Sequence, residues 1–241
     1  PPTPPPPLPI THLLNLCGHD ISLSPLFGLR PWSFPSSKSQ IRSSRLVPTS
    51  TLRSYASSMS PEPRFISSSG IGYYGSSPES SEPHTEDDDY GGSGGPSPPP
   101  SDFLASLSRE WESSAGPGSI VIRTAPVLSP SYGVLSKLRL PFYLGLGGRM
   151  GTGRQRFPWV SEADWCRAVH HVMFHPSPSR CYNVVAPETS TQEEFAKALA
   201  RHMNRPSVVP MPAMVVDAMF GEMGRDVLLG GTWAEPRRLL G

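Results

Sequence analysis

Three histidines, His170, His171 and His175, are residues whose type and spacing could do chemistry. His171 and His175 lie one helical turn apart, and histidine pairs on one helical face can bind zinc. The H-E-x-x-H pattern of a zinc enzyme does not accompany them. The sequence therefore predicts no metal site here.

Residues 67–70, Ser-Ser-Ser-Gly, suggest a second kind of chemistry, nucleophilic catalysis by serine. A Ser/His/Asp hydrolase carries its serine in a G-x-S-x-G turn, and the first glycine is missing here. Tyr73 and Tyr74 follow closely. A tyrosine at this place could act as a general acid, or it could be a packing residue with a satisfied hydroxyl. The residues leave both interpretations open.

Glycines at positions 145, 147, 148, 151 and 153 could form a phosphate-binding loop. Their spacing differs from G-x-G-x-x-G, and they precede a short strand instead of opening a helix. We therefore expect a turn on the substrate side that needs glycine backbone angles. A G-x-x-G-x-x-G loop does not precede Asn15 either.

Composition restricts the partners of this chain. It has 241 residues, 31 of them proline, a net charge of +1 and no basic stripe, so neither nucleic acid nor a membrane surface is expected. A small-molecule substrate or a protein partner remains. The three cysteines lack C-x-x-C spacing, which predicts reduced thiols in an intracellular protein, cytoplasmic or mitochondrial. No apolar run approaches the ~20 residues of a membrane span.

The elements that must position these residues alternate in type. Apolar runs predict strands at residues 10–18, 64–69, 119–123, 157–160 and 180–185. Helical spacing predicts helices at residues 38–57, 103–115, 132–144, 162–174, 191–203 and 211–223. Such alternation indicates an α/β fold with a parallel sheet. The expected buried side chains are Phe103, Leu107, Trp111, Val121, Phe142, Trp159, Val184 and Phe195.

We expect five segments along the chain. They are a proline-rich segment 1–9, a partial dinucleotide-binding domain 10–75, a low-complexity loop 76–101, the remainder of that domain with the substrate pocket 102–185, and a C-terminal helical domain 186–241. The loop, with its acidic run 86–89, should be solvated and mobile. Prolines between residues 25 and 63 should exclude regular elements. The strand at 10–16 should be an edge of the sheet.

Several short motifs resemble one family in their order. Residues 15–18 (NLCG) resemble the N-L-A-G turn after its fourth strand, and residues 65–75 (FISSSGIGYYG) resemble its S-S-x-x-G-Y-Y-G strand and turn. Further matches are Ser44-Arg45, Trp111-Glu112, Arg123-Thr124, GTGRQ at 151–155 and FPWV at 157–160. The chain thus resembles atypical extended short-chain dehydrogenase/reductases of the epimerase family type, which have a Rossmann-like fold and bind NADP(H). That fold begins with a strand and a G-x-x-G-x-x-G loop for the pyrophosphate. The resemblance therefore implies that the first strands are absent here and that the chain is truncated.

The resemblance implies catalytic roles at the end of the second predicted strand. Ser69 matches the serine that hydrogen-bonds a substrate carbonyl or hydroxyl, and Tyr73 lies nearby as a candidate general acid. The Tyr-x-x-x-Lys positions of classical members fall on Leu104 and Ser108, which cannot exchange protons as that pair does. Asp164 matches a family aspartate, and we expect it to cap a helix or to interact with the helix dipole.

The resemblance also implies binding roles. Leu16, Cys17 and Gly18 would line the nicotinamide or ribose side of NADP. Arg45 would bind a phosphate, unless it is a solvated helix arginine. The substrate pocket would be shaped by Gly151, Gln155 and Trp159. The implied function is an NADP(H)-dependent oxidoreductase or epimerase-like protein of unknown substrate. The alternative is a non-catalytic remnant or interaction protein that keeps the substrate-side lobe.

Overall fold

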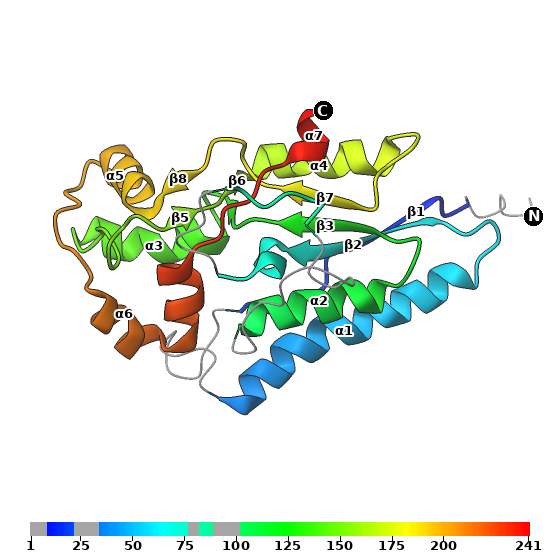
Figure 1. Ribbon diagram of the computed structural model, residues 1–241, viewed down its shortest axis with the longest axis horizontal. Coiled ribbons are helices and arrows are strands. Elements are labelled where there is room, and N and C mark those ends of the chain that lie inside the picture. Colours follow the sequence, from blue (N-terminus) through cyan, green and yellow to red (C-terminus); the bar gives the residue numbers. More distant parts are fainter. Residues whose placement is uncertain (1–8, 22–33, 77–81, 89–101) are drawn as a thin grey trace, which may run out of the picture.

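A computed structural model describes residues 9–21, 34–76, 82–88 and 102–241 (Figure 1). Its strands are β1 (His12–Asn15), β2 (Arg64–Gly70), β3 (Ile120–Thr124), β4 (Val127–Leu128), β5 (Arg156–Phe157), β6 (Val160–Ser161), β7 (Cys181–Val184) and β8 (Ser190–Thr191). Its helices are α1 (Pro35–Ser57), α2 (Phe103–Ala115), α3 (Gly133–Tyr143), α4 (Glu162–Phe174), α5 (Gln192–His202), α6 (Ala213–Phe220) and α7 (Arg237–Leu240). A 3₁₀ turn, η1 (Ile71–Tyr74), and a π-helix, η2 (Gly224–Gly230), complete the list. The α/β fold class is confirmed.

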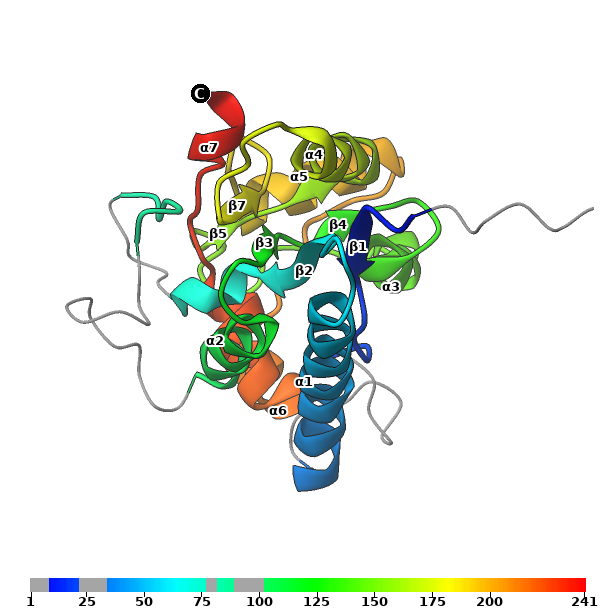
Figure 2. The same ribbon diagram turned by 90° about the vertical axis from the view of Figure 1, so that its right-hand side faces the viewer.

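Four strands form a parallel sheet in the order β1-β2-β3-β7. Figures 1 and 2 show α1 and α2 against one face of this sheet and α4 against the other. Ile66 and Val172 are buried on the α4 side, whereas Phe65 packs with Ala56 and Ala115 on the α1/α2 side. A parallel sheet is covered on both faces because helices connect its strands. The carboxyl ends of all four strands therefore meet at one edge.

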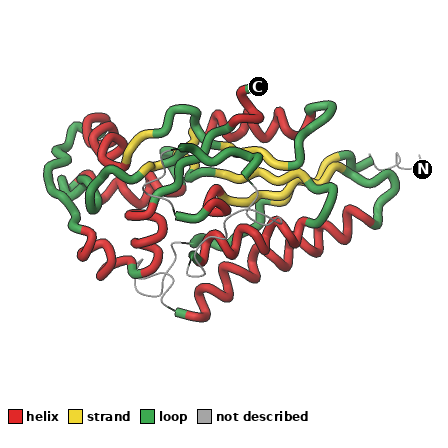
Figure 3. The backbone as a smooth tube through the Cα atoms, in the orientation of Figure 1, coloured by secondary structure: helices red, strands yellow, loops and turns green. Residues whose placement is uncertain are grey.

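The first strand lies at one edge of the sheet, as expected (Figure 3). It pairs with β2 from His12 beside Arg64 to Asn15 beside Ser67. Within the described residues no strand pairs with its outer side. The strand has only 4 residues, which keeps the number of exposed backbone groups small.

The helix expected at 38–57 is confirmed as α1, so the expectation that prolines would exclude regular structure up to residue 63 is wrong there. This helix runs for 23 residues, with Pro35 in its first turn and Pro48 in its interior. Proline is tolerated in a first turn because the amide there has no helical partner. Pro48 removes one helical hydrogen bond, but Thr49 Oγ1 donates to the Arg45 carbonyl one turn earlier at 2.6 Å. Among the described helices, none combines the length and apolar character of a membrane span.

Two predicted elements in the C-terminal half are divided in the structure. The expected strand at 157–160 forms β5, paired with β8, and β6, paired with β4. The change of partner occurs at Pro158, which has no amide hydrogen to continue a ladder. The expected helix at 211–223 ends early, because Gly221 takes a positive φ of 59° after α6. The chain then continues as η2.

Burial agrees with most of the expected core. Leu107, Trp111, Val121, Phe142 and Val184 are buried. The other three residues, Phe103, Trp159 and Phe195, are only partly buried. Two of these rings interact near the surface: the Lys38 ammonium lies 4.9 Å from the Phe103 ring centre, and Phe195 stacks on Phe157.

The expected solvated acidic run needs one correction. Residues 77–81 and 89–101 of the low-complexity loop, like residues 1–8, lie outside the described residues. Within 82–88, Glu86 is only 7% exposed. Its Oε1 accepts hydrogen bonds from the backbone amides of Asn183 and Arg238. Glu86 therefore attaches this segment to β7 and α7, a long-range contact that local composition does not reveal.

Replacing Val172 by Ala tests the packing of α4 on the sheet. Val172 is fully buried, so removal of its methyl groups leaves a cavity and should lower the free energy of unfolding by about 2 kcal/mol. The same substitution at Val208, which is 78% exposed, should cost less than about 0.5 kcal/mol. Urea unfolding of the two variants measures both values. Equal losses would contradict the described packing.

Candidate functional site

The loop that follows β1 contains the three residues expected beside a cofactor. The Cys17 amide donates to Asn15 Oδ1 at 3.1 Å, so the buried asparagine fixes the turn. Leu16, Cys17 and Gly18 are exposed. A Cβ atom placed on Gly18 would lie only 3.1 Å from Cζ of Arg45. The structure therefore brings together the loop and the arginine that were singled out separately.

Arg45 is a partly desolvated cation beside this loop. Its Nη1 donates to the Ile41 carbonyl at 3.0 Å, and its Cζ lies 5.2 Å from the Trp111 ring centre. Burial lowers the pKa of Arg45, and the charge of Asp20 acts in the opposite direction. A guanidinium with incomplete hydration favours a nearby anion, because an anion restores the interactions that burial removes. The interpretation of Arg45 as a fully solvated helix arginine is not supported.

Thr49 connects α1, α2 and β1 below Arg45. Its Oγ1 accepts from Nε1 of Trp111 at 2.9 Å and from Nδ2 of Asn15 at 2.7 Å. All three residues are buried. Sequence reasoning did not identify Thr49, because the partners come from three distant elements. The hydroxyl holds the end of β1 in fixed relation to both helices.

Ser69 lies at the carboxyl end of β2 and takes part in a buried ionic contact. Its Oγ donates to Oε1 of Glu112 at 2.9 Å. Arg123 donates to the same carboxylate through Nε at 2.8 Å and Nη2 at 2.9 Å. Ser69 and Arg123 are 3% and 5% exposed. The geometry is bidentate, the arrangement in which a desolvated ion pair is best compensated.

Two tyrosines surround the other side of the Arg123 guanidinium. Its Cζ lies 3.5 Å from the Tyr73 ring centre, and its Nη1 donates to Oη of Tyr74 at 3.0 Å. The Tyr74 hydroxyl also lies 2.8 Å from Oδ1 of Asn183 and from the Thr85 carbonyl. The ring of Tyr73 thus has a packing role, whereas the hydroxyl of Tyr74 belongs to a polar network.

Burial and neighbouring charges shift the pKa values of the groups in this network in opposite directions. Burial lowers the pKa of Arg123, but the hydrogen bonds and charge of Glu112 outweigh it and the pKa is raised overall. Burial raises the pKa of Tyr74, and Arg123 only partly compensates. Burial also raises the pKa of Cys181 to about 12. The network therefore contains a permanently charged arginine with a neutral phenol and a neutral thiol near it.

The residues at the positions of the dehydrogenase Tyr-x-x-x-Lys pair, Leu104 and Ser108, cannot exchange protons as that pair does. Leu104 packs against an apolar cluster that includes Leu107, Met223 and Val227. Ser108 is buried. This side of α2 is therefore a packing surface for the segment around η2.

The three expected substrate-pocket residues occupy a turn and the short strand after it. Gly151 has a φ of 57°, which glycine adopts without strain. Gln155 is buried, and its Nε2 donates to the carbonyls of Met150 at 3.0 Å and Leu228 at 2.8 Å. Trp159 is partly buried. Gln155 thus joins the turn to η2, and its side-chain amide is engaged internally.

The π-helix η2 also carries an acidic group that sequence reasoning missed. The Oδ2 atom of Asp226 is buried without a hydrogen-bond partner among the described residues. Burial raises the pKa of Asp226 to about 6, and the charges of Asp102 and Glu222 act in the same direction. Just beyond η2, Thr232 Oγ1 donates to the Gly75 carbonyl at 2.9 Å. This segment therefore connects the Gly151 turn with the turn after β2.

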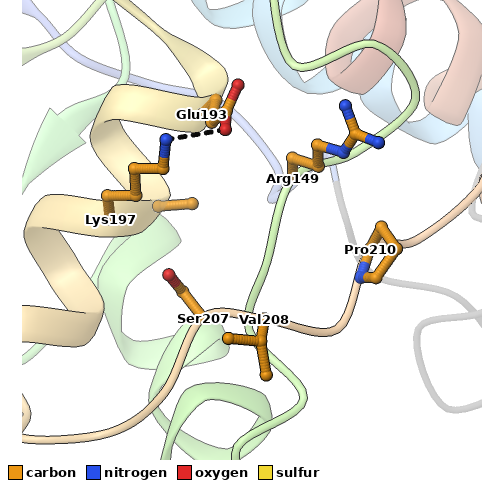
Figure 4. A pocket seen from close by; sticks show the side chains of 7 residues that line it. Arg149, Glu193, Lys197, Ser207, Val208 and Pro210 are labelled. Atoms are coloured by element: carbon orange, nitrogen blue, oxygen red, sulfur yellow. Dashed lines mark ion pairs between the residues drawn. The ribbon is translucent and has the colours of Figure 1, made fainter.

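A separate hollow of about 210 Å³ lies on the C-terminal part of the chain (Figure 4). It is lined by Arg149, Glu193, Ala196, Lys197, Ser207, Val208 and Pro210. Glu193 forms an ion pair with Lys197 at 2.7 Å at its edge. The lining residues do not include Ser69 or Arg45, so this hollow is not the candidate site.

Asp164, another candidate, has a structural role at the start of α4. Ser161 caps α4 by accepting from the Asp164 amide, and Asp164 pairs with Arg167 in the first turn. This is the helix-terminus role expected of Asp164.

The rings of His171 and His175 lie 5.0 Å apart. Among the described residues, no group of three or more His, Cys, Asp or Glu side chains is arranged to hold a metal.

The sheet order and the helices on both faces (Figure 1) define the class of protein as an α/β protein with a Rossmann-like fold. The Bordetella bronchiseptica enzyme WbmG, solved with NAD, has a TM-score of 0.67 at 13% identity, covering 95% of this chain and 64% of that chain. MoeE5, solved with UDP-glucuronic acid and NAD, has a TM-score of 0.66 at 19% identity, covering 95% and 71%. At these identities the likeness shows the fold alone. No protein-family model matches the chain.

Closer relatives show the family. The epimerase family protein Mb2239 of Mycobacterium bovis is 34% identical, covering 94% of this chain and 71% of the relative. The epimerase family protein SDR39U1 of Bos taurus is 36% identical, covering 94% and 74%. The crystal structure of human SDR39U1 with NADPH has a TM-score of 0.81 at 30% identity, covering 97% of this chain and 76% of that chain. The chain belongs to this epimerase family of extended short-chain dehydrogenase/reductases.

Substitution of Arg123 by Leu tests the buried ion pair. It removes the guanidinium and leaves the Glu112 carboxylate desolvated, so the free energy of unfolding should fall by about 3 to 5 kcal/mol. Arg167→Leu removes one member of an exposed pair, with side chains 77% and 63% exposed, and should cost about 0.5 kcal/mol or less. Chemical denaturation compares the variants. A similar loss in both variants would show that the buried pair contributes no more to the free energy of unfolding than the exposed pair.

Asp226 predicts a pH dependence. Its pKa of about 6 in the folded chain lies above the ordinary value of 3.8, so the folded state binds more protons than the unfolded state between these values. Stability should therefore fall as pH rises from about 4 to 6. Asp226→Asn should raise the melting temperature at pH 7 by an amount equivalent to about 1 kcal/mol after allowance for solvent screening, and have no effect near pH 4. Thermal scans across this range, with the exposed Glu188→Gln as control, measure it. A stabilisation that does not change with pH would contradict the assignment.

Proposed function

We propose that this chain is an NADP(H)-dependent oxidoreductase of the epimerase family that acts on a small-molecule substrate. The observation that carries the proposal is the contact between Gly18 and Arg45 at the carboxyl end of β1. It supports a cofactor position because a relative that is 30% identical over almost the whole chain was solved with NADPH. In open α/β sheets, ligands bind outside the carboxyl ends of the strands.

The residues beside β1 fit one end of this cofactor. Gly18 has no side chain, so the Arg45 guanidinium can lie against the backbone of this loop, 3.1 Å from where a Cβ atom would be. Arg45 supplies a half-buried positive charge for a phosphate or a ribose oxygen. Leu16 and Cys17 are exposed and would contact the nicotinamide or ribose side of the cofactor. NADPH, when bound, supplies the hydride. The sequence offers no G-x-x-G-x-x-G amides for the pyrophosphate, so we expect weak binding.

Ser69 would orient the substrate oxygen next to this loop. It lies one residue before the end of β2, the neighbour of β1 in the sheet. Glu112 accepts its hydrogen bond and is itself held by Arg123. Tyr73 remains a candidate proton donor. We propose that Gly151 and Trp159 border the substrate, and that Gln155 contributes by holding their turn against η2.

One observation favours a second candidate function, that of a non-catalytic interaction protein. Leu104 occupies the position of the classical catalytic tyrosine and is packed in an apolar cluster. Ser69 and Tyr73 are buried, at 3% and 4% exposure. Such a protein would retain the fold without changing the oxidation state of NADPH. Cofactor binding without turnover of any carbonyl or alcohol would support this alternative.

Titration with NADPH, followed by its fluorescence, tests the proposed function. The chain should bind NADPH more weakly than human SDR39U1, because its residues include no G-x-x-G-x-x-G amides and each phosphate contact contributes about 1 to 3 kcal/mol. Arg45→Ala should weaken binding further, by about tenfold. Arg42→Ala is the matched control, since Arg42 lies on the same helix and pairs with Glu110.

Three outcomes of this titration would contradict the predictions. If the chain does not bind NADPH, the proposed function is wrong. If Arg45→Ala and Arg42→Ala weaken binding equally, Arg45 has no cofactor role. Low-micromolar binding by the unaltered chain would show that pyrophosphate amides are not needed for tight binding here.

A further inference from the structure

The hydrogen bond between Ser69 and Glu112 has a defined direction. A carboxylate only accepts hydrogen bonds, so the Ser69 hydroxyl is the donor over the 2.9 Å from Oγ to Oε1. A hydroxyl has one hydrogen and two lone pairs. Once its hydrogen points to Glu112, Ser69 can only accept hydrogen bonds from any other partner.

Arg123 keeps Glu112 in this accepting state. Its Nε and Nη2 donate to the two carboxylate oxygens, and the two side chains are 6% and 14% exposed. The carboxylate therefore receives hydrogen bonds from Arg123 and from Ser69 and donates none.

The accepting hydroxyl of Ser69 lies near the proposed cofactor loop. Asn15 of β1 lies beside Ser67 of β2 in the parallel register. Ser69 follows Ser67 near the carboxyl end of β2, and the proposed nicotinamide loop begins directly after Asn15, so both lie at the same edge of the sheet. A substrate group next to the nicotinamide would thus meet the oxygen of Ser69 after its hydrogen has been committed to Glu112.

We propose that Glu112 is a positioning residue that makes Ser69 a hydrogen-bond acceptor, so that the site selects a ligand with a hydroxyl group over the matching carbonyl. The selection of ligands rests on the proposed function. The orientation of Ser69 does not, because it follows from contacts within the chain. The two parts are therefore tested separately.

The first experiment measures the orientation through a thiol placed at position 69. Ser69→Cys should give a thiol whose pKa lies above the usual value of about 8.5, because its proton is shared with a carboxylate. The ultraviolet absorbance of the thiolate, as a difference from the unaltered chain, follows the titration. Ser68→Cys is the matched control, since Ser68 precedes it on β2 and its side chain points to the opposite face.

Adding Glu112→Gln to Ser69→Cys should lower the thiol pKa by about 1 or more, because the negative charge is removed and Arg123 remains. Glu110→Gln, on the same helix and paired with Arg42, should leave it unchanged. If the Gln variant does not fold, Glu112→Asp withdraws the carboxylate by one methylene and should shift the pKa in the same direction. A thiol pKa that is insensitive to both changes at Glu112 overturns the proposed orientation.

The second experiment tests selection with cyclohexanol and cyclohexanone as matched probes. Calorimetry on the full chain saturated with NADPH should show about tenfold tighter binding of the alcohol. Ser69→Ala should abolish this preference, and Glu112→Asp should reduce it. Equal binding, tighter binding of the ketone, or binding of neither probe overturns the selection. Absence of NADPH binding contradicts the proposed function instead, and the thiol titration then still decides the orientation of Ser69.

Discussion

The buried ion pair between Arg123 and Glu112 is the contact on which the centre of this structure depends. It joins β3 to α2, and through the same charged groups it holds Ser69 on β2 and Tyr74 on η1. Two desolvated charges are tolerated because the carboxylate and the guanidinium satisfy each other in two parallel hydrogen bonds. The pair is thus both a structural connection between elements and the reason that Ser69 has a fixed hydroxyl direction.

Adjacent residues of α2 serve the two halves of the candidate site. Successive residues of a helix project about 100° apart, so Trp111 and Glu112 address different neighbours. Trp111 contacts Arg45 and Thr49 on the side of β1, while Glu112 contacts Ser69 and Arg123 on the side of the sheet. The same helix therefore sets the distance between the proposed cofactor loop and the proposed catalytic serine. The C-terminal segment completes the surroundings, because η2 packs against both α2 and the turn that Gln155 holds.

Local signals in the sequence were sufficient for most elements. Helical spacing predicted helices at 103–115 and 191–203, and both are confirmed as α2 and α5. Asp102 caps the first of these helices, and Thr191 with Glu194 forms a capping box at the second. The strands of the sheet follow from short apolar runs, and the α/β class follows from their alternation with helices. The motifs also identified the family. These features are determined within a few residues of chain, where backbone propensity, capping and periodicity act.

The tertiary structure alone decided which side chains meet. Burial of Glu86, the connection through Thr49 and the perturbed Asp226 depend on partners that are distant in sequence, so composition and periodicity carry no signal for them. Gln155 could be singled out by motif, but its internal hydrogen bonds to Met150 and Leu228 follow from the packing of η2. The sequence by itself determined the fold class and the family. Its motifs also singled out Ser69 and Gly18 as candidate site residues. Only the folded chain determined the direction of the Ser69 hydrogen bond, because that depends on a carboxylate and a guanidinium brought together from α2 and β3.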